Sequence, residues 1–380
     1  MAIVSLLSLG CGGSPAGVEA TDCAALAGRL LGAPERRRLL VIGSNFTTGV
    51  AFRIDPATMQ TEPLSLGVTG DTVARMAGDA LVLLHRSQTQ GDNLTLFDAR
   101  PVRPRYVCQL ALSRDDERVR GLRPWVNAHD VVALDASTLA VARYNLGSLA
   151  VIDLQRGALT RTVDLTAFQG RAALPYPDAM ARVGDEIWVS LQRLDDLVHP
   201  TQPGLIVRFD AALTRVVGTL ALPYANPYGP FRRLDDGRVA LATLGDYSVI
   251  GDGGLLAIDP QSQTVTVLRD EAALGSNLDG FVFFDAERVL LKRAGARDGG
   301  GGEVGVRFTI EGGDAPRELV QRALWAPAFP EVMGALGWVG DPGRALGDDA
   351  AVRAFTRDGD AIAAFTMPDA MRPYDLLPVP

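Results

Sequence analysis

Histidine and cysteine are scarce, because the 380 residues contain only three of each. No Gly-x-Ser-x-Gly motif accompanies the histidines, so the sequence does not indicate a Ser-His-Asp catalytic triad. Basic runs are short as well: the longest is Arg36-Arg37-Arg38, and the formal net charge is −8. Because nucleic-acid binding needs clustered positive charge, we expect no nucleic-acid partner. We also expect no cofactor.

Aromatic residues make up only 6% of the chain, whereas glycine and proline number 41 and 23. This much Gly and Pro suits many short strands joined by tight turns, and a helical protein of this length would need less. With 47% apolar residues, the chain can bury a large core. No charged or Ser/Pro-rich linker interrupts residues 38–380, so we predict one all-β domain over this range.

One pattern recurs seven times, about every 43 to 57 residues: an apolar run, a polar loop, a second apolar run and a turn. Five of the second runs end on Asp, and looser copies lie at 304–310 and 351–358. The five are Gly49–Asp55, Leu94–Asp98, Ser148–Asp153, Leu205–Asp210 and Leu255–Asp259. An Asp at a strand end can accept backbone N–H bonds in the following turn. The repeat predicts a seven-bladed β-propeller of four-stranded blades.

The clearest copy spans residues 129–165 and contains four strand-like runs, the third closing on Val151-Ile152-Asp153. This unit resembles that of the YVTN-repeat, YncE-like propellers, and looser matches occur at Val216–Leu220 and Ile258-Asp-Pro. The chain is also similar to myxobacterial-type envelope lipoproteins of unknown function, on the segments Asn127–Asp130, Ala142–Asn145 and Leu191–Leu194. Both resemblances imply a propeller and neither implies an activity.

The two ends of the chain are expected to meet in one blade. Blade 1, which opens at Leu39, lacks an innermost strand of its own, whereas Arg372–Pro378 has the form of one. We therefore predict that this C-terminal strand completes blade 1 and closes the ring. Closure would hide two strand edges that would otherwise be open.

The amino terminus has the pattern of an export signal. Ala2–Leu9 is small and apolar but too short to span a bilayer, and Leu7-Ser-Leu-Gly-Cys11 looks like a bacterial lipobox. The resemblance predicts a signal peptide at 1–11, lipidation of Cys11, and a tether with a short helix over 12–37. It implies a protein of the bacterial cell envelope, lipid-anchored in the outer membrane, periplasmic or secreted. The alternative is a disordered tail with a buried free cysteine.

Two cysteines, Cys23 and Cys108, remain once Cys11 is set aside, and an even count in an oxidising compartment favours a disulfide. Asp22 is a candidate N-cap for a short helix over Ala24–Leu31 that would be marginal alone. A bridge to Cys108 would hold it against a blade. The alternative is a pair of small unpaired core residues.

Polar residues gather on the loops that enter the innermost strands and on those that follow the second strands. These loops share one face and surround the central funnel. The candidate ligand residues are His129, Asp130, Arg143, Asp178, Arg193, Tyr228 and Asn277. Alternating acidic and basic groups suit a small polar ligand or a peptide. Alternatively, the polar groups only cap strands and pair with one another, each Arg neutralising the Asp beside it.

Two functions remain open on the sequence alone. The first is a monomeric, non-catalytic envelope lipoprotein whose propeller is a binding platform for a protein or small polar ligand. The second is a lactonase-like or metal-dependent hydrolase with its site in the funnel. No metal site is indicated outright, but His85, His129 and Asp130 could meet across neighbouring blades and bind a divalent metal.

Overall fold

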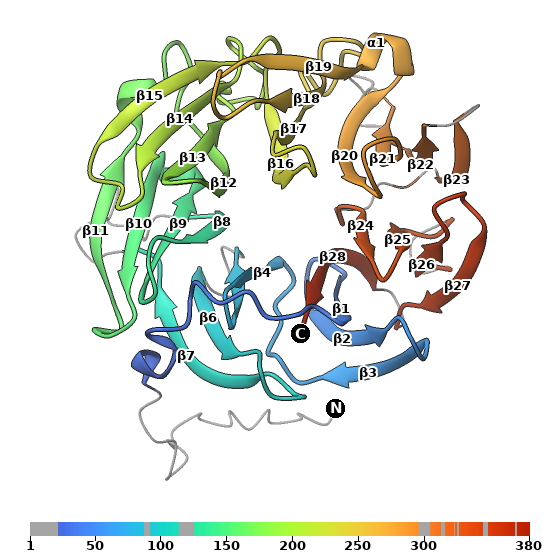
Figure 1. The fold of residues 1–380 in the computed structure, drawn as a ribbon, viewed down its shortest axis with the longest axis horizontal. Helices are drawn as coiled ribbons and strands as arrows, with labels where there is room; N and C mark the ends of the chain where they lie inside the picture. Colours follow the sequence, from blue (N-terminus) through green and yellow to red (C-terminus); the bar gives the residue numbers. More distant parts are fainter. Residues whose placement is uncertain are drawn as a thin grey trace, which may run out of the picture.

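Seven four-stranded antiparallel sheets are arranged in a closed ring (Figure 1), and we call the centre of this ring the channel. The computed structural model describes residues 22–86, 92–113, 125–295, 305–312, 316–322, 324, 327–344, 349–368 and 371–380. The sheets confirm the seven-bladed β-propeller. The predicted signal peptide and lipidated Cys11 lie outside the described residues.

The strands of blades 1 to 4 run in each case from the channel outwards. Blade 1 holds β28 (Arg372–Val379), β1 (Arg38–Ser44), β2 (Gly49–Asp55) and β3 (Gln60–Leu64). Blade 2 holds β4 (Thr72–Ala77), β5 (Ala80–His85), β6 (Asn93–Asp98) and β7 (Arg105–Ala111). Blade 3 holds β8 (Ala128–Ala133), β9 (Thr138–Arg143), β10 (Ser148–Asp153) and β11 (Ala158–Asp164). Blade 4 holds β12 (Pro177–Val183), β13 (Glu186–Leu191), β14 (Leu205–Asp210) and β15 (Val216–Ala221).

Blades 5 to 7 follow the same order. Blade 5 holds β16 (Pro227–Arg233), β17 (Val239–Thr243), β18 (Gly254–Ile258) and β19 (Val265–Asp270). Blade 6 holds β20 (Asn277–Phe283), β21 (Val289–Ala294), β22 (Val306–Glu311) and β23 (Arg317–Arg322). Blade 7 holds β24 (Glu331–Met333), β25 (Leu336–Asp341), β26 (Ala351–Phe355) and β27 (Ala361–Thr366). The short helical turns are η1 (Cys23–Leu26), η3 (Tyr144–Leu146), η4 (Thr166–Phe168) and α1 (Glu271–Leu274). No helix among the described residues is long and apolar enough to cross a membrane.

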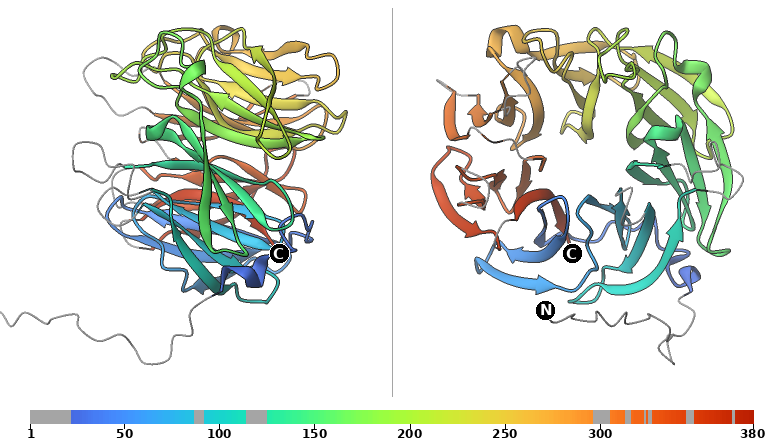
Figure 2. Two further views of the ribbon diagram at one scale, coloured as in Figure 1. Left: turned by 90° about the vertical axis from the view of Figure 1, so that its left-hand side faces the viewer. Right: turned by 180° about the vertical axis from the view of Figure 1, so that it is seen from behind.

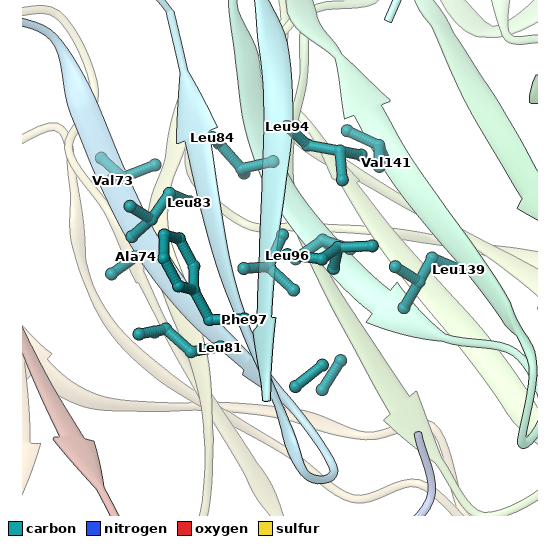
Figure 3. Close-up of a cluster of buried hydrophobic side chains, with 14 of the residues drawn as sticks. Val73, Ala74, Leu81, Leu83, Leu84, Leu94, Leu96, Phe97, Leu139 and Val141 are labelled. Atoms are coloured by element: carbon teal, nitrogen blue, oxygen red, sulfur yellow. The ribbon is translucent and has the colours of Figure 1, made fainter. Parts of the chain in front are cut away.

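Burial explains where apolar runs occur in the repeat. Every residue of β5 is buried, whereas the outermost strand β15 alternates between exposed and half-buried residues. A middle strand is covered on both faces by neighbouring blades, so it reads as a continuous apolar run. Figure 3 shows this packing between blades 2 and 3, where Leu94 and Leu96 lie beside Leu139 and Val141 in one buried cluster.

The Asp residues that end the third strands cap the turns, as the sequence predicts. The Asp55 carboxylate accepts from the backbone N–H of Ala57 at 2.9 Å and of Thr58 at 3.2 Å. Asp259 does the same for Gln261 at 2.8 Å and Ser262 at 3.1 Å. The recurring Asp is therefore a structural signal for hairpin turns.

The C-terminal strand closes the ring. β28 pairs antiparallel with β1, from Arg38 opposite Val379 to Ser44 opposite Arg372. Figure 1 shows β28, in red, beside β1, in blue. Blade 1 thus joins the two ends of the described chain, in agreement with the prediction.

The N-terminal helix is shorter than predicted. Asp22 caps it by accepting from the N–H of Ala24 at 2.9 Å, but η1 ends at Leu26. The helix cannot continue because the N–H groups of Gly28 and Leu30 donate to the carbonyl of Ala136, in the turn between β8 and β9. The residues after Leu26 are therefore held by hydrogen bonds to blade 3 and do not form further helical turns.

A disulfide joins Cys23 to Cys108 on β7, which confirms the predicted pairing. The loop it closes spans 85 residues, and both cysteines are buried. Because the bridge restricts the unfolded chain, we expect the Cys23→Ala/Cys108→Ala variant to lose about 2–5 kcal/mol of unfolding free energy in urea denaturation. Non-reduced protein should be lighter than reduced protein by two hydrogen atoms. Two free thiols in the non-reduced protein would refute the bridge.

Candidate ligand site at the mouth of the channel

The polar residues of interest lie on the face where the innermost strands begin. We call it the upper face; it includes the loops at 45–48, 144–147, 192–204 and 244–253. Figure 2 (right) views the ring from this face, and Figure 1 views it from the opposite face, which carries the Asp-capped turns.

β-bulges in two innermost strands orient aspartate side chains towards neighbouring blades. The pairing register shifts between Ala128 and Val131 in β8, and between Pro177 and Met180 in β12. A bulge of this kind bends the strand and re-aims the side chains within it. Asp130 and Asp178 lie within these two bulges.

Three aspartates on innermost strands link adjacent blades through hydrogen bonds to backbone N–H groups. A carboxylate oxygen of Asp130 accepts from the N–H of Met180 at 2.8 Å, which joins blade 3 to blade 4. Asp178 accepts from Gly229 at 2.9 Å, joining blades 4 and 5. In the same way, Asp375 on β28 accepts from Ala74 on β4 at 2.7 Å. These aspartates therefore have a structural role.

Arg75 on β4 neutralises two of the aspartates. Its Nε lies 2.9 Å from Asp130 Oδ1, and its Nη1 lies 3.2 Å from Asp375 Oδ2. Burial raises the pKa of both carboxyl groups, and the charge of Arg75 opposes this rise. The three side chains form one buried ionic network across blades 1, 2 and 3.

His129 is held rigidly at the channel mouth. Its Nδ1 lies 2.8 Å from Asp178 Oδ1, and its ring stacks on Tyr144 with centroids 3.9 Å apart. Burial lowers the His129 pKa although Asp178 opposes the shift, so the ring is neutral near pH 7. A neutral ring that donates from Nδ1 has a hydrogen-bond acceptor at Nε2. Within the described residues, Nε2 makes no hydrogen bond.

Arg86 lies on the other side of the mouth. Its Nε donates to Asp71 at 2.8 Å and its Nη2 to the Tyr374 hydroxyl at 2.8 Å, and its guanidinium lies 5.8 Å from the Tyr374 ring centroid. Two of the three guanidinium nitrogens are thus fixed. Among the described residues, Nη1 has no hydrogen-bond partner.

Tyr228, in the innermost strand of blade 5, supplies a third polar group. Its ring packs on Phe329 with centroids 5.6 Å apart. Burial raises the pKa of the Tyr228 hydroxyl, so it stays protonated. No described residue hydrogen-bonds this hydroxyl, which can therefore both donate and accept.

Arg86, His129 and Tyr228 all line one cavity of about 100 Å³, which we call the channel-mouth cavity. It is smaller than the sites that bind drug-sized molecules. The cavity lining contains the carboxylates of Asp130, Asp178 and Asp375 and the guanidinium groups of Arg75 and Arg86, which leaves a formal charge of −1. The cavity therefore favours a neutral polar or a cationic group over an anion.

Asn277, Arg143 and Arg193 lie outside this cavity. Asn277 donates to the carbonyl of Tyr247 at 3.3 Å. Arg143 is buried and donates to Ser148, at 3.1 Å, and Thr162, at 3.2 Å, while Arg193 donates to the carbonyl of Pro203.

The alternative in which Arg143 neutralises Asp130 and Arg193 neutralises Asp178 does not hold in the structure. Asp130 pairs with Arg75, and Asp178 pairs with His129. Arg143 and Arg193 begin loops of the upper face, but their side chains do not turn towards the channel.

The hypothetical metal set also fails to assemble. His85 on β5 hydrogen-bonds Thr95 at 2.9 Å and Thr72 at 3.2 Å, and burial lowers its pKa to about 4. It does not join His129 and Asp130. Among the described residues, no group of three or more His, Cys, Asp or Glu side chains is placed to hold a metal.

Sequence reasoning missed two groups of the site. Arg75 gave a usable signal, since it is the only charged residue of the innermost strand β4. Tyr374-Asp375 repeats the pair seen at His129-Asp130, in which a residue that lines the cavity precedes an aspartate. Each could have been found by aligning the innermost strands of all blades.

Comparisons with known proteins support the fold alone. No family profile and no curated protein matches the chain. A structure from Bacteroides uniformis, provisionally described as a 6-phosphogluconolactonase, is 13% identical with a TM-score of 0.54, covering 90% of this chain and 99% of that chain. A hypothetical selenium-binding protein from Sulfolobus tokodaii is 10% identical with a TM-score of 0.54, covering 93% and 96%. The chain is a seven-bladed β-propeller, a class that supports many functions.

Proposed function

We propose that this protein is a non-catalytic binding protein whose ligand occupies the channel-mouth cavity. The observation that carries the proposal is the convergence of three polar groups, from Arg86, His129 and Tyr228, on one small cavity. Asp130 and Asp375 are already bonded to backbone N–H groups and to Arg75, and Asp178 is bonded to the N–H of Gly229 and to His129. The groups from Arg86, His129 and Tyr228 are therefore the ones that we propose bind the ligand. They come from three blades, which hold them in fixed positions.

The charge of the cavity narrows the class of ligand. A formal charge of −1 in the lining disfavours carboxylates and phosphates, whereas a primary amine or a hydroxyl can bond His129 Nε2 and the Tyr228 hydroxyl. We propose a small neutral polar or cationic group, either a free molecule or part of a protein.

We further propose that the protein is exported to the bacterial cell envelope, where Cys11 carries a lipid. The Cys23–Cys108 disulfide is of a kind that persists in oxidising compartments. The lipobox-like sequence at Leu7-Ser-Leu-Gly-Cys11 and the resemblance to myxobacterial-type envelope lipoproteins support the same assignment. Membrane contact would be through the lipid only, and the protein is proposed to be a monomer.

A thermal-shift screen tests the cavity. Simple amines, polyols and carboxylates would be tested at millimolar concentration, and hits measured by calorimetry. We expect amines or polyols to bind, and Tyr228→Phe and His129→Gln each to weaken binding about five- to tenfold, since each removes one hydrogen bond of about 1–1.5 kcal/mol. Tyr106→Phe, on exposed β7, should bind like the wild type. Hits that bind equally to all variants, or a screen in which only carboxylates bind, would reject the proposal.

One observation favours hydrolysis as a second candidate function. The His129–Asp178 pair has the geometry that orients a general base, and Arg86 could stabilise an oxyanion. The binding proposal predicts no turnover of a panel of lactones and esters. Turnover that disappears in His129→Gln but persists in His199→Gln would decide for the hydrolase.

A further inference from the structure

Four large apolar side chains protrude from two neighbouring loops of the upper face. Leu197 and Val198, between β13 and β14, are 73% and 45% exposed. Val249 and Ile250, between β17 and β18, are 45% and 43% exposed. We call these four residues the apolar rim. The ion pair between His199 and Asp246, at 2.8 Å, ties the two loops together, so that the rim forms one surface.

One residue of the rim, Val198, has an unfavourable backbone conformation. Val198 has a φ of +63°, in the left-handed region that β-branched residues avoid. Such a residue costs free energy, and here the strain places an apolar side chain in water, which brings no stability. Backbone strain of this kind concentrates where a site requires it.

A path of aromatic rings connects the rim with the channel-mouth cavity. His129 stacks on Tyr144, and the Tyr144 ring centroid lies 4.9 Å from that of Tyr176. The loop that carries Leu197 begins beside Tyr176, because the N–H of Gln192 donates to the carbonyl of Tyr176 at 3.1 Å. Asp195 and Asp196 lie further along this loop. Because these two aspartates directly precede Leu197, the rings lead from the cavity to the rim.

Acidic side chains lie at both ends of this path, beside the apolar rim and in the wall of the channel-mouth cavity. Asp195 and Asp196 flank the rim, and Asp178 lies in the cavity wall. The rim loops also carry two described basic residues, Arg193, which donates to the carbonyl of Pro203, and His199, which pairs with Asp246. A partner that covers this surface must therefore supply apolar side chains and positive charge.

We propose that the apolar rim and the channel-mouth cavity form one docking surface for an extended segment of a partner protein, with apolar side chains beside a lysine or arginine. This rests on the proposed function and names its ligand. The apolar side chains cover the rim, the chain crosses Tyr144 and Tyr176, and the cationic group enters the cavity near Asp178 and Tyr228. Stacked aromatic rings suit a peptide because they offer flat apolar faces with polar edges.

Fluorescence anisotropy with labelled peptides tests this surface. Three probes of equal length would be used, alternating Leu with Lys, Leu with Glu, and Ser with Lys. We expect the Leu/Lys peptide to bind and the other two to bind at least tenfold more weakly. The double variant Leu197→Ser/Ile250→Ser should weaken binding of the Leu/Lys peptide at least tenfold. The control Val102→Ser/Val216→Ser, which removes exposed apolar residues elsewhere, should leave this binding unchanged. Melting temperatures confirm that both variants fold.

Parallel measurements separate the failure of this inference from that of the cavity proposal. Equal binding of the Leu/Lys and Leu/Glu peptides, or no effect of the rim substitutions, overturns the docking surface. If Tyr228→Phe still loses amine or polyol binding in that case, the cavity proposal stands. Binding of the rim to phosphatidylglycerol vesicles in preference to the Leu/Lys peptide also overturns the inference.

Discussion

Deletion of residues 372–380 is expected to abolish cooperative unfolding. The deletion removes β28, which pairs along the whole of β1 and carries Asp375, the acceptor for Ala74 and a partner of Arg75. Without it, the edge of β1 is open and the network between blades 1, 2 and 3 loses one of its two carboxylates. We expect a sloping thermal transition without a defined midpoint, measured by circular dichroism and calorimetry.

Removal of Pro380 alone provides the matched control. This residue follows β28 and lies outside its pairing with β1, so the melting transition should stay cooperative and nearly unchanged. An unchanged melting transition in the longer deletion would show that the ring does not depend on its C-terminal strand.

Asp130→Ala is expected to lower the free energy of unfolding by about 3–5 kcal/mol, the cost of breaking a buried ion pair from one side. The substitution leaves the N–H groups of Met180 and Val131 without their acceptor and deprives Arg75 of one of its two carboxylates. Urea unfolding followed by fluorescence measures the loss.

Two further variants show where the loss comes from. Asp185→Ala removes an exposed aspartate from the turn between β12 and β13 and should cost well under about 1 kcal/mol. Asp130→Asn keeps an acceptor oxygen but removes the charge, so it should lie between the wild type and Asp130→Ala. If Asp130→Ala were as stable as Asp185→Ala, the interblade role of Asp130 would be wrong.

The architecture follows from the sequence because its causes are local. The third strands end on Asp where a turn needs an acceptor, as at Asp55 and Asp259, and middle strands are apolar because neighbouring blades cover both faces. The segment Arg372–Pro378 has the sequence pattern of an innermost strand, and this pattern was enough to predict that the segment closes the ring. The helix predicted from Ala24 onwards was too long, because its end depends on hydrogen bonds to Ala136, which is distant in sequence.

The site could be predicted only in part. Asp130 and Asp178 were recognisable at the starts of innermost strands, and His129 and Tyr228 beside them line the cavity. Their partners could not be read from the sequence, because Arg75 reaches Asp130 from another blade through a strand bulge that the sequence does not mark. The regular spacing of the repeat therefore suggested Arg143 as a ligand residue. In the structure, the Arg143 side chain points away from the channel.

A crystallographic soak with small amines, polyols and carboxylates tests the central claim, that the channel-mouth cavity is the ligand site, most directly. The account predicts that amines or polyols occupy the cavity, within hydrogen-bond distance of His129 Nε2 or the Tyr228 hydroxyl, and that carboxylates do not. Compounds bound only elsewhere on the ring, with the cavity unoccupied in every soak, would contradict it.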